Sequence, residues 1–214
     1  MRQILPDVWM TEPEWPDRQN WPDLKFNGFL MMRERGNLLF NRSEHASDHA
    51  DMAKLGGVAR HYIAHGHEAG PGLAAIKKRF GNVLLAHRAA ARDVSPHTEI
   101  DHRLEGGDVF VDGVEVIRTP GHTASNVALK VQSRQGETYL FVGDTIFPAK
   151  DGWEAVVFPD EGGDKSQLKQ SLAALARLTP DVVFFSATLT DEGFHRFSQG
   201  EWQAALEEAA HSLK

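Results

Sequence analysis

The chain has 214 residues, a mass of 23.8 kDa, a formal net charge of −7 and no cysteine. This length favours one domain over residues 1–214, large enough to bury a core. The acidic balance, without any basic run, argues against a nucleic-acid partner, and the missing cysteines exclude disulfides, cysteine zinc sites and thiol nucleophiles. The proline-broken, acidic N-terminus does not resemble a signal peptide, and no apolar run is as long as a membrane span, so we expect a cytoplasmic protein without a membrane partner.

The first part of the chain predicts short strands followed by one helix. Tryptophans, phenylalanines and the run Leu38–Phe40 alternate with prolines and turn residues over the first forty positions, which indicates strands and turns. A helix is expected from about Ser47 to Leu55, closed by two glycines. Residues 58–64 then predict a strand that leads into a loop carrying His65 and His67.

The middle of the chain alternates between helix and strand patterns. Pro71 suits a first helical turn, apolar residues follow at helical spacing, and Gly81 is a typical helix end. Apolar runs at 83–86, 126–131 and 139–142 predict strands. Asp112–Gly113 between two valine-rich runs, 109–111 and 114–117, predicts a β-hairpin.

The last third predicts two helices around one buried strand. Asp164 and Gln167 have the spacing of a capping box, and leucines on one face predict a helix that stops before Pro180. Residues 182–185 predict a buried strand, and an amphipathic helix closes the chain around Trp202 and Leu206. Mixed strands and helices without a flexible linker predict a single α/β domain.

The candidate chemistry lies at the ends of three predicted strands. His65 and His67 follow one strand, His122 follows another in a Pro-Gly-His-Thr turn, and Asp144 follows a third. Turns at strand ends are where α/β proteins build sites. Three imidazoles suit Zn²⁺ with a water at an open position, and such a water becomes a nucleophile near neutral pH.

These motifs give the chain a resemblance to the metallo-β-lactamase superfamily, especially its glyoxalase-II-like hydrolases. The matching segments are residues 62–68, 72–81, 119–125 and 140–147, in the family's order. The resemblance covers roughly residues 30–190 and implies an α/β fold, a four-layer αββα sandwich. It implies that His65, His67 and His122 are ligands of a first metal, and that Asp144 is the aspartate that bridges two metals.

The chain departs from this family around the second metal. The family's loop reads His-x-His-x-Asp-His, and its last two ligand positions are here Ala69 and Gly70. The family's last histidine usually follows the late buried strand. Here residues 186–188 follow that strand, and the segment through Thr188 contains no histidine. The family's Asp-Thr-Gly-like turn is replaced by residues 41–43. The sequence therefore predicts at most one metal, zinc or iron, held by His65, His67, His122 and Asp144, and leaves open that none is bound.

Loss of the aspartate at position 69 also removes a group that orients the attacking water, so surviving hydrolysis is expected to be slow or to use another base. Glu68 is one substitute, but a solvated loop carboxylate is the favoured interpretation. Glu44, His45 and His49 are candidate replacement ligands, for which helix-start or surface roles are favoured. His87 is expected to be a structural histidine.

Three functions follow from these observations. The favoured one is a mononuclear hydrolase of a small ester, thioester or lactone, which needs His65, His67 and His122 to hold a metal. The second is a non-catalytic binding module on the same fold. The third is an iron-dependent redox or persulfide-handling protein, since histidines and an aspartate do not select between zinc and iron. The substrate and the oligomeric state are not encoded in these motifs.

Overall fold

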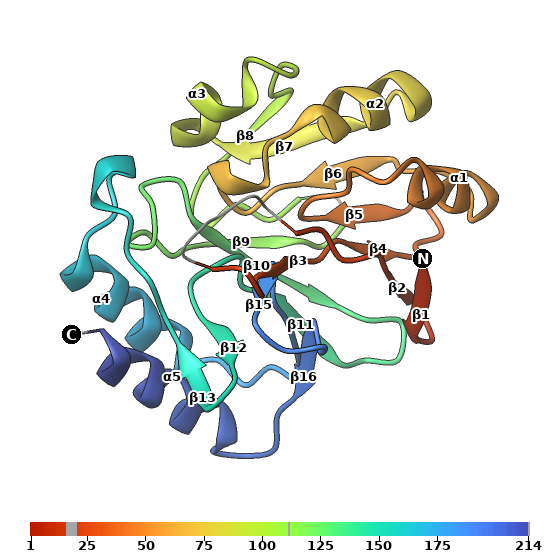
Figure 1. Cartoon of the computed structure of the whole chain (residues 1–214). Helices are drawn as coiled ribbons and strands as arrows, with labels where there is room; N and C mark the ends of the chain where they lie inside the picture. The colour runs from red at the N-terminus through yellow and green to blue at the C-terminus, as the bar shows by residue number, and fades with distance from the viewer. Residues whose placement is uncertain (16–20, 111, 214) are drawn as a thin grey trace. The chain divides into compact units, whose positions relative to one another are not determined.

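A computed structural model describes residues 1–15, 21–110 and 112–213 of the chain. The chain divides into two compact units, residues 1–104 (unit 1) and 105–214 (unit 2). Figure 1 traces their elements from red at the N-terminus to blue at the C-terminus. Within the described residues, no helix combines the length and apolar composition needed to cross a bilayer. The mixture of helices and several sheets confirms the predicted α/β class.

Unit 1 is built around a seven-stranded sheet with the strand order β1-β2-β4-β5-β6-β7-β8. The strands of the unit are β1 (Arg2–Leu5), β2 (Val8–Met10), β3 (Lys25–Phe26), β4 (Phe29–Met31), β5 (Leu38–Phe40), β6 (Arg60–Tyr62), β7 (Val83–His87) and β8 (His102–Leu104). Over residues 1–15 and 21–40, the chain thus forms the short strands that its composition predicts.

The pairing within this sheet decides where its loops emerge. β1, β2, β4 and β5 pair in antiparallel fashion, whereas β5, β6, β7 and β8 are parallel. Phe40 lies opposite Tyr62, and Tyr62 lies opposite Leu85. Because parallel strands end at the same edge, the segments after β5, β6 and β7 lie side by side there. This edge carries His65 and His67.

Three helices follow the parallel strands of unit 1: α1 (Ala46–Lys54), α2 (Pro71–Phe80) and α3 (Ala91–Val94). Helix α2 begins with Pro71 in its first turn and ends at Gly81, which adopts the left-handed conformation with φ 64°, as predicted. Leu73 packs with Ile63 and Leu84 from the sheet, so the apolar face of α2 covers the strand that leads to the histidine loop.

Unit 2 contains a five-stranded sheet with the order β16-β14-β11-β10-β9. Its strands are β9 (Glu115–Arg118), β10 (Val127–Gln132), β11 (Thr138–Phe141), β14 (Val182–Phe184) and β16 (Phe194–Arg196), and the unit also has β12 (Phe147–Ala149), β13 (Gly152–Glu154) and β15 (Ala187–Thr188). β10 is antiparallel to both β9 and β11, with Val127 opposite Arg118 and Leu129 opposite Phe141. The loops after β9 and β11 therefore emerge at the same edge, and they carry His122 and Asp144.

Helices α4 (Lys165–Leu175) and α5 (Glu201–Ser212) lie side by side in unit 2, as Figure 1 shows. Leu168, Leu172 and Trp202 join Leu140 and Val183 of the sheet in one buried cluster. Burying aromatic and leucine side chains of this size contributes about 2 kcal/mol each relative to exposure. The predicted cap is present, since the Asp164 side chain accepts a hydrogen bond from the Gln167 amide at 2.7 Å.

Two sequence predictions differ in part from the structure in unit 2. The predicted hairpin pairs around its turn, since the Phe110 amide donates to the Val114 carbonyl at 3.0 Å and an antiparallel bridge joins Val109 to Glu115. Its first arm is not a full strand within the described residues, and Val109 is 68% exposed. Position 111 of that run lies outside the described residues.

Helix α4 also ends at Leu175, earlier than its leucine pattern indicates. The Gln203 side-chain amide donates to the carbonyl oxygens of Ala176 and Leu178, at 3.2 and 3.4 Å. These bonds satisfy carbonyls just beyond the end of α4, and Pro180 disfavours the helical conformation at the residue before it. The helix therefore ends at Leu175, short of the residue that precedes the proline.

Candidate metal centre

His65 and His67 lie in the loop that follows β6, where His65 precedes a short 3₁₀ turn, Gly66–Glu68, and His67 lies within that turn. The backbone of His65 is extended, with φ −163° and ψ 178°. Each histidine offers one ring nitrogen within 4.8 Å of the other's, and the ring centroids are 5.0 Å apart. The spacing predicted from the sequence thus brings two imidazoles within reach of one cation.

Glu68 is buried and supports this pair. Its side chain has no exposed surface, and one carboxylate oxygen, Oε2, accepts the Ala64 amide at 2.6 Å. The other oxygen, Oε1, lies 3.4 Å from His65 Nδ1. The sequence interpretation of Glu68 as a solvated loop carboxylate is wrong, because the 3₁₀ turn folds the side chain back over the loop. A carboxylate beside a ring nitrogen fixes the orientation of a ligand histidine and raises its basicity.

The glycine between the two histidines lies against a side chain of α3. A Cβ atom at Gly66 would lie 2.2 Å from Oδ2 of Asp93 in α3. The loop after β6 and the helix after β7 meet here because their parallel strands end at the same edge. Asp93 was not a candidate in the sequence, since nothing in the local pattern links it to position 66.

In unit 2, His122 has a defined tautomer. Its Nδ1 lies 2.8 Å from the carbonyl oxygen of Val156, which can only accept, so Nδ1 carries the proton. The other nitrogen, Nε2, is then the basic one, and it lies 3.5 Å from Asp144 Oδ2. Both side chains are almost fully buried. An imidazole anchored through Nδ1 to a backbone carbonyl is the arrangement that ligand histidines use.

Helix α4 fixes the loop that carries His122. Gly121 has φ 129°, a conformation that side-chain-bearing residues rarely adopt, and a Cβ there would lie 2.2 Å from the Leu168 amide nitrogen. The Gly121 carbonyl accepts the Asp164 amide at 2.9 Å, and the Ser171 hydroxyl donates to the Pro120 carbonyl at 2.7 Å. The glycine lets the helix approach the backbone closely, and the helix then holds the loop.

A buried hydrogen-bond network joins this loop to the one that carries Asp144. Asn126 Nδ2 donates to the hydroxyls of Thr119 at 2.9 Å and Thr145 at 2.7 Å. The Thr145 hydroxyl also lies 3.1 Å from that of Thr119 and 2.8 Å from the Val142 carbonyl. All three side chains are fully buried. These buried hydrogen bonds tie the two loops together, and sequence reasoning missed them because Asn126 belongs to no ligand motif.

The four predicted ligands are brought together as two pairs, one in each unit. His65 and His67 form the pair of unit 1, and His122 and Asp144 that of unit 2. Imidazole nitrogens and one carboxylate are donors that suit zinc or iron, and the anchored His122 ring and the carboxylate beside His65 meet the requirements of metal ligands. Each pair therefore offers donor atoms that suit a metal ion.

The other candidate histidines take structural roles. His87 accepts the Ala89 amide through Nδ1 at 3.3 Å, in agreement with the structural role predicted for it. His49 and His45 bond the backbone carbonyls of Ser43 and Pro13, at 3.1 and 3.3 Å, which matches their expected role at the start of α1. His61 is fully buried, donates to the Asn41 carbonyl at 2.6 Å, and burial lowers its pKa to about 4.

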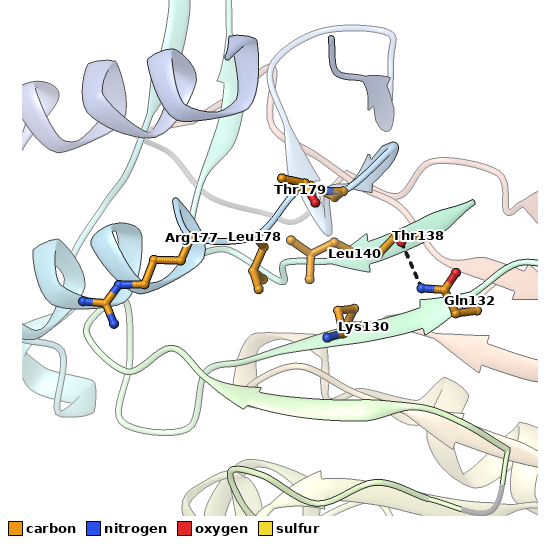
Figure 2. A pocket seen from close by; sticks show the side chains of 8 residues that line it. Lys130, Gln132, Thr138, Leu140, Arg177, Leu178 and Thr179 are labelled. Carbon is orange, nitrogen blue, oxygen red and sulfur yellow. Dashed lines mark hydrogen bonds between the residues drawn. The ribbon is translucent and has the colours of Figure 1, made fainter. Parts of the chain in front are cut away.

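A separate hollow of about 210 Å³ lies in unit 2 and is shown in Figure 2. It is lined by Lys130, Gln132, Thr138, Leu140, Arg177, Leu178, Thr179 and Pro180. Lys130 pairs with Glu115 at 2.5 Å, and Gln132 donates to the Thr138 hydroxyl at 2.9 Å. Neither His122 nor Asp144 lines it, so it is distinct from the ligand pair of the same unit.

Comparison with known proteins gives related sequences among hydroxyacylglutathione hydrolases, for example the following two. A hydroxyacylglutathione hydrolase of Polaromonas sp. is 32% identical over 124 residues, which are 56% of this chain and 43% of that protein. The hydroxyacylglutathione hydrolase of Brucella ovis is 28% identical over 134 residues, 61% of this chain and 45% of that protein. The chain thus aligns with less than half the length of these curated relatives.

The fold and the family are shown by two further comparisons. A B3 metallo-β-lactamase described as the first with an active-site glutamic acid has a TM-score of 0.69 and 14% identity, and the match covers 89% of this chain and 86% of that one. At this identity the likeness shows the fold alone, and it confirms the predicted metallo-β-lactamase-like class. The family model of the metallo-β-lactamase superfamily matches residues 43–187, well over half of the chain. The chain therefore belongs to the metallo-β-lactamase superfamily.

Proposed function

We propose that the protein is a mononuclear metal-dependent hydrolase in which His65, His67, His122 and Asp144 hold one zinc or iron ion. Residues 1–214 would then act as one domain, to which each unit contributes one ligand pair. Family membership and the order of the motifs along the chain support joining the two pairs. The main observation behind this proposal is the hydrogen bond from His122 Nδ1 to the Val156 carbonyl. It leaves the basic nitrogen of His122, Nε2, beside Asp144.

The substrate class we propose is a small thioester. The sequence relatives are hydroxyacylglutathione hydrolases, and an acyl group carried on the sulfur of glutathione is a thioester. A bound metal would supply Lewis acidity to a carbonyl group and to water. The protein's own contribution is to orient two ligand rings: Glu68 lies beside His65, and the Val156 carbonyl anchors His122. It also keeps the ligand pairs largely out of solvent.

The loss of an acidic residue at position 69 supports the alternative function, a non-catalytic binding module. Ala69 packs against the apolar cluster that contains Ile63 and Leu73. A methyl group in this position accepts no hydrogen bond from water. Without a replacement base, turnover would fall by about a hundredfold or more relative to an enzyme that has the carboxylate.

Metal content and thioester hydrolysis together test these two functions. Protein expressed without added metal should contain one equivalent of zinc or iron, and His122→Ala and His67→Ala should lose it. His211→Ala, an exposed histidine on α5, is the control and should retain it. Protein that contains no metal and binds none when zinc or iron is added would refute the proposed metal-dependent hydrolase. Metal-loaded protein with no turnover of thioesters, esters or lactones would leave the binding module as the function.

A further inference from the structure

Two acids and one arginine form a network beside the histidine loop of unit 1. Arg42 Nε donates to Glu14 Oε2 at 2.5 Å, and the Glu44 backbone amide donates to Glu14 Oε1 at 2.6 Å. The Glu14 side chain is 7% exposed, and the Arg42 guanidinium lies 5.7 Å from the Phe26 ring. Glu14 therefore fixes both the guanidinium and the backbone from which the Glu44 side chain extends.

The side chain of Glu44 reaches across to the loop after β6. Its Oε2 accepts the Gly72 amide at the start of α2, at 2.6 Å, and its Oε1 lies 3.7 Å from Arg42 Nε. The two segments are neighbours because β5 and β6 are parallel and end at the same edge. The carboxylate is thus fixed by a backbone amide on one side and faces a cation on the other.

Gly70 is a glycine because of this carboxylate. Its backbone is extended, with φ −174°, which any residue adopts, so conformation does not demand glycine there. The lack of space favours glycine instead, since a Cβ atom at Gly70 would lie 2.1 Å from Glu44 Oε1 and 3.6 Å from Arg42 Nη2. The network of Glu14, Arg42 and Glu44 occupies the room that a side chain at position 70 would need.

We propose that this network closes the second cation position of the loop and limits the protein to one metal. The inference rests on the proposed function, in which His65 and His67 hold that metal. A ligand side chain at position 70 would have to displace the Glu44 carboxylate from the Gly72 amide. A second cation beside it would also face the guanidinium, whose positive charge cannot be removed near neutral pH. Returning the ligand side chains alone should therefore not restore a second metal.

Zinc stoichiometry tests this with matched variants. Ala69→Asp/Gly70→His/Thr188→His, with the network intact, should bind one zinc per chain, like the unchanged protein. Adding Arg42→Gln and Glu44→Ala should raise the count to two, since glutamine still donates to Glu14 but carries no charge. Two zinc ions in the first variant, or one in the second, would overturn the proposal.

A second experiment is independent of metal, so it separates this inference from the proposed function. In metal-free protein, Gly70→Ala should lower Tm by roughly 2 to 10 °C, the range expected for an overpacked site. In the Glu44→Ala background the same change should have little effect, because the carboxylate it meets is gone. Equal losses in both backgrounds would contradict the proposal even if the unchanged protein binds one zinc. The unchanged protein could instead bind no zinc while Gly70→Ala still lowers Tm only when Glu44 is present. That result would refute only the proposed function.

Discussion

The ligand loops of the two units are held by different chemistry. The loop from His65 to Gly70 is surrounded by charged side chains: Glu68 inside it, Asp93 against Gly66, and Glu44 against Gly70. The loops that carry His122 and Asp144 are fixed by neutral groups, namely backbone carbonyls, threonine hydroxyls and the Asn126 amide.

This difference separates the physical sensitivities of the two ligand pairs. Neutral buried hydrogen bonds do not change with pH over the physiological range, and they are lost only when a partner is removed. Carboxylate contacts depend on protonation and on the charges nearby. We therefore expect mutations of the neutral network to act on folding, and acid and charge changes to act on the histidine loop of unit 1.

The largest effect should come from breaking the neutral network. Asn126→Ala removes two buried hydrogen bonds and leaves a small cavity, and should lower the free energy of unfolding by about 3 kcal/mol. Chemical denaturation measures this. Gln132→Ala is the matched control, since Gln132 also bonds a threonine hydroxyl but is exposed, and it should change stability by less than about 0.5 kcal/mol. Similar losses in both variants would show that burial is not what makes the network important.

Acid should weaken unit 1 through His61, which lies in the strand that precedes the histidine loop. Burial lowers the pKa of His61 from 6.5 to about 4, so the unfolded chain binds its proton first as the pH falls. Stability is thus full above pH 6.5 and is lost as the pH falls from 6.5 toward 4; this group accounts for about 2 kcal/mol between pH 7 and pH 5. Denaturation of metal-free protein at several pH values measures the slope.

His61→Gln serves as the comparison for this pH effect. Glutamine keeps a donor for the Asn41 carbonyl but does not titrate, so the slope between pH 7 and pH 5 should become shallower. An unchanged slope would place the acid sensitivity elsewhere in the molecule.

The support that Glu68 gives to His65 should appear in metal affinity. Glu68→Ala removes the carboxylate beside Nδ1 and should weaken zinc binding by about 10- to 100-fold, as measured by competition with a chelator. Glu68→Gln keeps an acceptor for the Ala64 amide, so its folding stability should exceed that of the alanine variant. Unaltered affinity in both variants would mean that the carboxylate serves the backbone only.

The smallest effect is expected at Gly66. Gly66→Ala places a Cβ atom against Asp93 Oδ2, and that side chain is 31% exposed and can move aside. A loss of about 1 kcal/mol in unfolding free energy is expected, and Asp93→Ala/Gly66→Ala should recover most of it. No recovery would locate the strain in the loop backbone instead of in this contact.

Much of the fold could be predicted from local patterns. The start of α2 at Pro71, its end at Gly81 and the Asp164 cap of α4 each depend on residues a few positions apart. The hairpin around Asp112 was predicted correctly as a pairing, since the Phe110 amide bonds the Val114 carbonyl and Val109 bridges Glu115. Its first arm was predicted as a strand but adds only this bridge, and Val109 is exposed. Helix α4 ends earlier than predicted, and the carbonyls of Ala176 and Leu178 just beyond it accept hydrogen bonds from the Gln203 side chain of α5.

The sequence by itself determined the candidate ligands, since His65, His67, His122 and Asp144 are recognised by their residue type and their place after strands. It also determined that Ala69 and Gly70 cannot act as ligands, because neither has a donor atom. Only the tertiary structure decided the surroundings of these positions: the burial of Glu68, the Val156 carbonyl on His122, and the Glu44 carboxylate over Gly70. These contacts join segments brought together by strand pairing or chain folding, and local spacing carries no information about them.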